Sequence, residues 1–267
     1  MNDSLNFVYC LDKNYNKQAF LSIASLLREC AKDKFKIYII HKSPWTFKKY
    51  KNRLLHLFPN HEVIVIKFKF NIRNYPKLKK SHVSEATYYR IFLGDHIPEV
   101  SGCITYIDSD AFVVSDPTQE IKALISFIQE NEYLIGAKTT DYFEKHQSLD
   151  IFERLGISNK YFNAGVLIIN LEKWKKDDVS KKLKNKVIEI KDSIVYWDQD
   201  VLNAFIDGDY VEIPEELNSI INIQEKENID LERTKIVHYV GKLKPWDKKG
   251  LKINPNTFYQ KLNKDYF

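Results

Sequence analysis

The composition of this 267-residue chain excludes several classes of protein. Hydrophobic residues make up 44% and charged residues 29%, which is typical of a globular protein and excludes a mainly disordered chain. Lys and Arg number 41 against 36 Asp and Glu, and the resulting net charge of +5 is too balanced for a dedicated nucleic-acid binder. Three cysteines, Cys10, Cys30 and Cys103, are odd in number and far apart, so they indicate neither a disulfide framework nor a Cys-x-x-Cys metal site and favour a reducing compartment.

Apolar runs alternate along the chain with segments of helical periodicity. Phe20, Ile23, Ala24 and Leu27 share one helical face, whereas residues 35–41 (FKIYIIH) are β-branched and aromatic, as in a strand. Strands are expected at residues 5–10, 35–41, 62–68, 103–107, 133–137 and 235–240, with a further apolar run at 162–171. Helices are expected at residues 17–30, 44–57, 84–93, 118–129, 172–191 and 197–206.

The order of these elements predicts an α/β fold in one continuous domain. Strands and helices alternate through the first half, which favours a parallel sheet covered by helices, with ligands bound beyond the carboxyl ends of the strands. The eight glycines form neither GxGxxG nor GxxxxGK[ST], so a bound nucleotide would be held without these loops. Residues 247–267 mix five lysines with aromatic rings, and a solvated C-terminus is favoured there over a membrane-surface segment.

Three Asp-x-Asp pairs occur, and their surroundings distinguish them. The pair at 207–209 flanks a glycine between a helix and a short strand, which is typical of a turn. The pair at 198–200 opens a helix, where acids favour the N-terminus, so a functional role and a helix-end role both stay open. Asp108 and Asp110 follow a buried strand, where charge is costly unless a cation or hydrogen-bond donors meet it. This last pair is the candidate site for a divalent cation.

Four blocks of sequence carry a resemblance to a known family. They are residues 84–116 (SEATYYRIFLGDHIPEVSGCITYIDSDAFVVSD), 161–174 (YFNAGVLIINLEKW), 197–203 (WDQDVLN) and 238–246 (HYVGKLKPW). In this order they resemble the retaining glycosyltransferases of family 8, which include bacterial lipooligosaccharide galactosyltransferases and glycogenin. The resemblance runs from about residue 6 to residue 246 and divides the chain into a domain at 1–246 and a short basic, aromatic tail at 247–267.

This resemblance implies a GT-A nucleotide-diphospho-sugar transferase fold, with a mostly parallel central sheet flanked by helices. It also implies a UDP-sugar donor and a Mn²⁺ ion, or Mg²⁺, held by Asp108, Asp110 and His238. Two carboxylates and an imidazole leave coordination positions open for diphosphate oxygens, and the imidazole favours Mn²⁺. A lone histidine near a strand end is more often a packed side chain, but Gly241 and Lys244 downstream favour the metal role.

The resemblance assigns further roles around the donor. Asp12, Asn14 and Tyr15 meet the uridine, where a turn is the structural alternative. Arg90 reaches the donor sugar unless it forms a surface ion pair instead. The nucleotide-sugar-binding residues implied in full are Asp12, Asn14, Tyr15, His82, Val83, Arg90, Ser109, Asp141, Asn163, Ala164, Gly241 and Lys244.

Gln199, Asp198 and Lys244 are the implied catalytic residues. An amide such as Gln199 is a poor nucleophile, so front-face attack by the acceptor hydroxyl is preferred over double displacement, which needs a nucleophilic carboxylate. Asp198 stays open as an alternative nucleophile. Lys244 stabilises the charge that develops on the leaving UDP.

The expected activity is transfer of a hexose, galactose or glucose, to a glycan acceptor such as a surface oligosaccharide. Whether this acceptor is attached to a lipid is left open. A nucleotidyltransferase and a noncatalytic nucleotide-sugar-binding relative are the alternatives. The acceptor is expected at loops 139–159 and 214–232, and the oligomeric state is not predicted. No secretory signal or run of about 18 uncharged apolar residues is found. The cytoplasm is therefore expected, with weak association with the inner face of the cell membrane left open.

Overall fold

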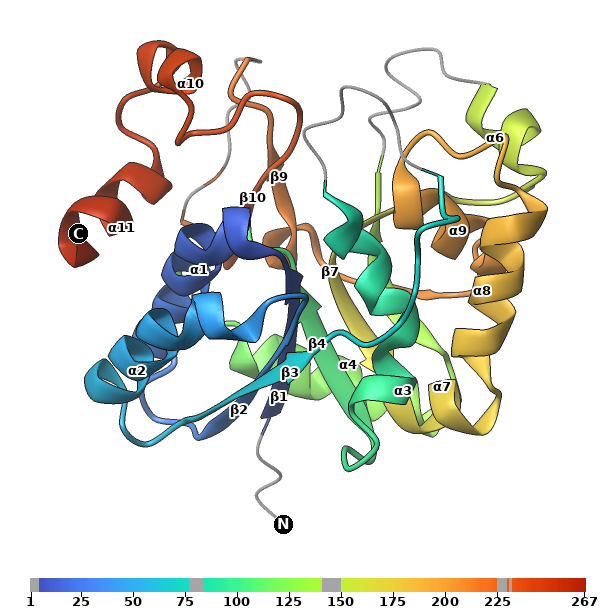
Figure 1. Ribbon diagram of the computed structural model, residues 1–267, viewed down its shortest axis with the longest axis horizontal. Helices are drawn as coiled ribbons and strands as arrows, with labels where there is room; N and C mark the ends of the chain where they lie inside the picture. The colour runs from blue at the N-terminus through green and yellow to red at the C-terminus, as the bar shows by residue number, and fades with distance from the viewer. Residues whose placement is uncertain (1–4, 77–83, 141–149, 225–229, 231) are drawn as a thin grey trace.

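A twisted sheet divides the fold into two helical layers (Figure 1). The structure, a computed structural model, describes residues 5–76, 84–140, 150–224, 230 and 232–267. Within these residues, seven strands pair in the order β3-β2-β1-β4-β7-β6-β8. The strands are β1 (Leu5–Leu11), β2 (Phe35–His41), β3 (Glu62–Lys67), β4 (Cys103–Ile107), β6 (Ile135–Thr139), β7 (Phe162–Asn170) and β8 (Val211–Glu212).

The direction of β7 determines which residues reach the carboxyl edge of this sheet. Pairs β1/β2, β2/β3, β1/β4 and β6/β8 are parallel, whereas β7 is antiparallel to both β4 and β6. Because Ile107 at the end of β4 lies opposite Val166, the first residues of β7 reach the edge where β4 ends. The expected mostly parallel sheet flanked by helices is confirmed.

Alternate residues of the central strands enter different hydrophobic cores. On β1, Phe7 and Tyr9 pack into the core under α1, while Val8 and Cys10 pack into the core on the other face. Burial on both faces explains why these strands read as continuous apolar runs. The first layer holds α1 (Asn16–Glu29), α2 (Lys48–Leu57) and α4 (Thr118–Glu130); the second holds α7 (Leu171–Lys176), α8 (Val179–Glu189) and α9 (Trp197–Ile206) (Figure 1).

A small second sheet brings the C-terminal half beside the end of β4. It has the order β5-β10-β9, formed by β5 (Ala111–Val113), β10 (Ile236–Tyr239) and β9 (Ser219–Ile221). The antiparallel register of β5 and β10 places His238 opposite Ala111. Since Asp110 directly precedes Ala111, strand pairing alone carries His238 to the Asp-x-Asp turn.

Some elements differ from the sequence expectation. Residues 84–93 form mainly a 3-10 helix, η3 (Glu85–Phe92), followed by the short α3 (Leu93–His96), instead of one α-helix. The helix expected at 172–191 is split into α7 and α8 because Asp178 adopts a left-handed conformation, with φ of 52°. The helix expected at 44–57 begins as the 3-10 helix η2 (Pro44–Phe47), and β8 is the short strand expected after residue 209. Elements that were not anticipated include α6 (Asp150–Leu155), the 3-10 helices η1 (Lys13–Tyr15) and η4 (Glu215–Leu217), and strands β5 and β9.

The C-terminal residues are anchored on the first helical layer. They form α10 (Lys248–Ile253) and α11 (Phe258–Tyr266), which lies against α1 (Figure 1). Tyr259 and Leu262 are buried in the core, and Tyr266 packs edge-on against Phe20. The expectation of a simply solvated C-terminus therefore does not describe α11. No helix within the described ranges has the length and apolar character needed to cross a bilayer.

Candidate active site

The turn between β4 and β5 presents two carboxylates at the carboxyl edge of the sheet. The Asp108 backbone N–H donates to Gly165 O at 2.8 Å, and the Ala111 N–H closes the turn on Asp108 O at 3.0 Å. Asp110 accepts from Lys244 Nζ at 2.8 Å and lies 3.4 Å from His238 Nε2. Three residues predicted from distant parts of the sequence thus meet at one turn.

Asp108, Asp110 and His238 have the geometry of a cation site. Each offers one ligand atom, and the three atoms all lie within 4.8 Å of one another. Gly165 forms the wall behind the imidazole, since a Cβ on Gly165 would lie only 2.0 Å from His238 Cε1. Oxygen donors with one imidazole suit Mn²⁺ and leave positions for further oxygen ligands. The residues present therefore fit a divalent cation.

Lys244 is the main cationic neighbour of Asp110. Its ammonium is buried and also donates to Tyr239 O at 2.5 Å. Burial alone would raise the pKa of Asp110, but Lys244 and then His238 hold it below its usual value. Asp110 is consequently ionised and ready to bind a cation at neutral pH.

Arg90 connects the Asp-x-Asp turn to the start of α9. It is only 3% exposed, which excludes the surface ion pair considered as an alternative. Its Nη2 donates to Asp108 Oδ1 at 3.0 Å, and its Nε lies 2.5 Å from Asp198 Oδ2. The guanidinium also donates to Ala164 O and covers the ring of Tyr106 at 4.1 Å. One buried cation thus neutralises two carboxylates of the site.

The first turn of α9 directs its two carboxylates to different partners. Burial raises the pKa of Asp198 to about 6, although Arg90 opposes the shift. Asp200 is fully buried and accepts from Arg154 Nη1 at 2.8 Å and from the Tyr161 hydroxyl at 2.7 Å. Asp198 therefore faces the site, whereas Asp200 holds α9 against α6 and the start of β7.

Gln199 lies between these two carboxylates in the sequence, and both ends of its amide are hydrogen-bonded. Its Oε1 accepts from Ala164 N at 3.0 Å, and its Nε2 donates to the Tyr161 hydroxyl at 3.1 Å. Trp197, at the start of the same helix, has φ of 52°, a conformation that is strained for a bulky side chain. Such strain is often found at functional sites, and here it immediately precedes two candidate catalytic residues.

Asn163 adjoins the cation site from the start of β7. Its Oδ1 accepts from Gly165 N at 2.9 Å and from Asn218 Nδ2 at 3.0 Å. Asn218 also contacts His238, with its Oδ1 3.0 Å from Nδ1. Sequence reasoning missed Asn218, because it stands outside the recognised blocks and nothing local to it indicates a site.

The loop after β1 is both a turn and a neighbour of the carboxylates. Asp12 accepts from the Asn14 backbone N–H at 2.8 Å, which caps η1 as expected for the structural alternative. The ring of Tyr15 packs edge-on against that of Trp246, with the ring centroids 6.2 Å apart. Burial raises the pKa of Tyr15, and the charges of Asp110 and Asp108 raise it further. The Tyr15 hydroxyl therefore lies close enough to the Asp-x-Asp turn to interact with its charge.

The remaining predicted residues are placed less directly. Gly241 adopts φ of +82° in the turn after β10, which brings the chain back toward Lys244. Ser109 is buried, and its hydroxyl has no hydrogen-bond partner among the described residues. His82, Val83 and Asp141 lie outside the described residues. In the pair at 207–209, Asp207 accepts from Ser158 N at 2.9 Å in a left-handed conformation, which confirms a turn.

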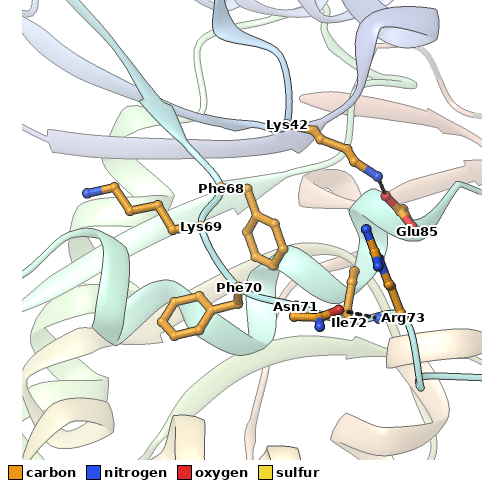
Figure 2. A pocket seen from close by; sticks show the side chains of 8 residues that line it. All are labelled: Lys42, Phe68, Lys69, Phe70, Asn71, Ile72, Arg73 and Glu85. Atoms are coloured by element: carbon orange, nitrogen blue, oxygen red, sulfur yellow. Dashed lines mark hydrogen bonds and ion pairs between the residues drawn. The ribbon is translucent and has the colours of Figure 1, made fainter.

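A hollow of about 440 Å³ lies beside the end of β3 and is lined by Phe68 and Phe70 together with charged side chains (Figure 2). Lys42 reaches across it to pair with Glu85 at the start of η3 (Figure 2). Among the described residues, none of those predicted for binding or catalysis lines it. The lining residues are Lys42, Phe68, Lys69, Phe70, Asn71, Ile72, Arg73 and Glu85.

Comparison with known proteins gives the same assignment as the sequence blocks. A model of glycosyl transferase family 8 matches residues 6–250. Among curated proteins, a lipopolysaccharide 1,2-glucosyltransferase of Escherichia coli is 27% identical over 259 residues, covering 91% of this chain and 74% of that protein. A lipopolysaccharide 1,3-galactosyltransferase of Salmonella typhimurium is 25% identical over 257 residues, covering 93% and 74%.

A solved structure matches the fold over nearly its whole length. The galactosyltransferase LgtC, in complex with donor and acceptor sugar analogues, superposes with a TM-score of 0.75 at 22% identity and covers 98% of this chain and 96% of that one. Its likeness shows a GT-A fold, with the large sheet and flanking helices described above. The family match across residues 6–250 establishes that this chain is a member of glycosyltransferase family 8.

Proposed function

We propose that this glycosyltransferase is a retaining hexosyltransferase that moves galactose or glucose from a UDP-sugar to a glycan acceptor. The observation that carries the proposal is the convergence of Asp108, Asp110 and His238 within 4.8 Å at the carboxyl edge of the sheet. These residues would hold Mn²⁺, or Mg²⁺, which supplies Lewis-acid stabilisation of charge on the diphosphate. The names of the lipopolysaccharide glucosyl- and galactosyltransferase relatives support the choice of sugar and acceptor class.

In the proposed reaction, the bond between the anomeric carbon and the β-phosphate oxygen breaks, and negative charge grows on UDP. Lys244, a buried ammonium beside Asp110, stabilises that charge where it develops. The surrounding residues bind the donor: Tyr15 offers a ring face for the uracil, while Arg90 and Asn163 bind the sugar. His82, Val83 and Asp141 stay in this proposal on the resemblance alone.

Front-face attack is the proposed route to retention. Asp198 is 2% exposed and held 2.5 Å from Arg90, which argues against its leaving this pair to attack carbon. Gln199 uses both ends of its amide in hydrogen bonds to Ala164 and Tyr161. With neither group free to act as nucleophile, the acceptor hydroxyl enters on the face that the diphosphate leaves, and the leaving phosphate takes its proton.

The acceptor is proposed to be a surface oligosaccharide assembled in the cytoplasm. Weak association with the inner face of the membrane is supported by α10, where Leu251 and Ile253 are exposed beside Lys248, Lys249 and Lys252. Apolar side chains among lysines favour an anionic membrane surface. Sedimentation with vesicles containing anionic lipid tests this association, and vesicles of neutral lipid are the control.

The central proposal is tested by measuring UDP release from UDP-galactose and UDP-glucose with Mn²⁺, with and without EDTA. We expect release with at least one donor and its loss on chelation. Release that EDTA leaves unchanged would exclude the metal-dependent mechanism. Binding of UDP-sugar without any release would instead indicate a noncatalytic relative, and pyrophosphate formation from UTP and a sugar phosphate would indicate a nucleotidyltransferase.

A further inference from the structure

Asn218 is a buried residue that links two parts of the proposed site. It lies between η4 and β9 and is 1% exposed. Its side chain contacts His238 Nδ1 at 3.0 Å through Oδ1 and Asn163 Oδ1 at 3.0 Å through Nδ2. Asn218 therefore joins a ligand of the proposed cation site to a residue proposed to bind the donor sugar, although it belongs to neither set.

The donor and acceptor roles in this network follow from one backbone group. The Gly165 N–H can only donate, and it lies 2.9 Å from Asn163 Oδ1, so Asn163 must present its oxygen there. The same oxygen faces Asn218, which must present its amide nitrogen. The remaining amide oxygen of Asn218 then faces His238 Nδ1 and can only accept. His238 must therefore carry a proton on Nδ1.

We propose that Asn218 is a positioning residue that fixes His238 in the Nδ1–H tautomer, so that the Nε2 lone pair faces the cation site. Nε2 is the ring atom on the side of Asp110, 3.4 Å from its Oδ1. Because Nδ1 is bonded to Asn218, Nε2 is the ring atom left to bind a metal. The inference depends on one part of the proposed function, which is that this site binds a divalent cation.

Gly165 supports the same arrangement in a second way. Its absent Cβ leaves room for the imidazole, since a Cβ would approach Nδ1 to 2.6 Å and Nε2 to 2.8 Å. The ring is thus confined by backbone on one face and held by one amide at Nδ1. A histidine that binds metal usually donates its other N–H to such a partner, and loss of the partner typically weakens metal affinity by about 10- to 100-fold.

The tautomer of His238 is measurable without metal or substrate. In the full chain labelled with ¹⁵N-histidine, long-range ¹H–¹⁵N NMR spectra distinguish a protonated Nδ1 from a protonated Nε2. We expect the Nδ1–H form of His238 in the wild type and a shift toward the Nε2–H form in Asn218→Ala. A wild type whose Nδ1 carries no proton would overturn the proposal, and this result is obtained from the wild type alone, without any variant.

Affinity for Mn²⁺ alone, measured by calorimetry, is the second readout. Asn218→Ala should weaken it about 10- to 100-fold. Asn218→Asp retains an acceptor for Nδ1–H but no donor for Asn163, so it should keep the Nδ1–H tautomer and Mn²⁺ affinity while raising the KM for the sugar donor. Equal Mn²⁺ affinities in wild type and a folded Asn218→Ala protein would contradict the proposal.

Asn16→Ala provides a matched control. Asn16 is another buried asparagine bonded to a histidine, with its Oδ1 2.9 Å from His41 Nε2, but it does not contact the Asp-x-Asp turn. This variant should leave both the His238 tautomer and Mn²⁺ affinity unchanged, whatever it costs in stability. Because neither readout needs turnover, a failure of the positioning role can be told apart from a failure of the proposed transferase activity.

Discussion

The missing side chain of Gly165 provides the space that the imidazole of His238 occupies. The two residues come from β7 and β10, which belong to different sheets, and a Cβ on Gly165 would lie 2.0 Å from His238 Cε1. This contact fixes how closely the small sheet approaches the large one at the cation site.

Gly165→Ala should therefore displace His238 and weaken Mn²⁺ binding by about tenfold or more, as expected when the support of a metal ligand is lost. Overpacking should also lower the free energy of unfolding by about 1–3 kcal/mol. Calorimetry with Mn²⁺ and urea denaturation measure the two effects. Gly94→Ala is the control, because its Cβ would meet only side chains, at 3.1 Å or more, away from the site. Wild-type Mn²⁺ affinity in Gly165→Ala would contradict this account.

Asp110→Asn should abolish transfer and leave the fold intact. The substitution removes one charge from the cation site while its amide oxygen can still accept from Lys244. A bound metal contributes several kcal/mol of charge stabilisation, so kcat/KM should fall by more than about 100-fold. Activity with UDP-sugar and Mn²⁺ measures the loss, and far-UV circular dichroism checks the fold. Asp209→Asn, at an exposed turn, should remain active; turnover at the wild-type rate in Asp110→Asn would exclude the metal hypothesis.

Arg90→Met should be strongly destabilising at neutral pH. It leaves Asp198 buried without its counter-ion, and breaking a buried pair typically costs about 3–5 kcal/mol. Arg90→Lys should lower the free energy of unfolding by less, because it keeps the positive charge. It should still lower it, because an ammonium cannot bond Asp108 and Asp198 with one planar group. Urea denaturation at pH 7 gives both values.

The loss in Arg90→Met should shrink when Asp198 can protonate. Burial raises the pKa of Asp198 to about 6 even beside Arg90, and removal of the cation raises it further. Adding Asp198→Asn should likewise recover much of the loss. An equal loss at pH 5 and pH 7 would show that packing, and not the unpaired carboxylate, accounts for the effect.

His41 should make the protein less stable as the pH falls below neutrality. Burial lowers its pKa from 6.5 to about 4, and its Nδ1 accepts from the Ser43 N–H at 2.8 Å, so protonation would break this bond. Above pH 6.5 both folded and unfolded chains carry a neutral ring. As the pH falls from 6.5 to about 4, only the unfolded chain binds the proton, which removes up to about 3 kcal/mol of stability.

Denaturation of wild type and His41→Gln at pH 7 and pH 4.5 measures this contribution. The variant should lose less stability between the two pH values than the wild type does, whatever its stability at pH 7. Burial also lowers the pKa of His61 and His96, which are present in both proteins. The difference in stability loss between wild type and variant therefore isolates the contribution of His41. Identical pH dependence in both proteins would assign the acid sensitivity to other groups.

Local patterns predicted the central strands and α9 well. Residues 35–41 and 197–206 match β2 and α9 because each combines a clear apolar pattern with distinct ends. The 3-10 geometry of η3 was not predictable, since its apolar spacing also suits an α-helix. Tertiary packing decides between the two kinds of helix in this segment, because Arg90 must reach both Asp108 and Asp198 from one buried position.

Asp108 and Asp110 were predicted as a cation site from their place after a buried strand, and His238 was added from the family resemblance. Strand pairing explains why the three meet. The partners of its ligands were less accessible to sequence reasoning. Asn218 carries no motif, and its position beside His238 and Asn163 depends on how η4 and β9 are placed by β10. Arg90 was expected to reach the donor sugar or to form a surface ion pair. Its buried bonds to two carboxylates depend on how η3 packs against β1 and α9.

The reversed direction of β7 places the residues proposed to bind the donor at one rim of the sheet and the far end of the strand at the opposite rim. Its first residues, including Asn163 and Gly165, open on the crevice, while Asn170 ends at the far rim beside Cys103. Libraries aimed at donor preference therefore belong at the first residues of the strand. A fluorescent label attached at position 172, where Glu172 is exposed just beyond the end of β7, would lie at the opposite rim of the sheet from the proposed donor site.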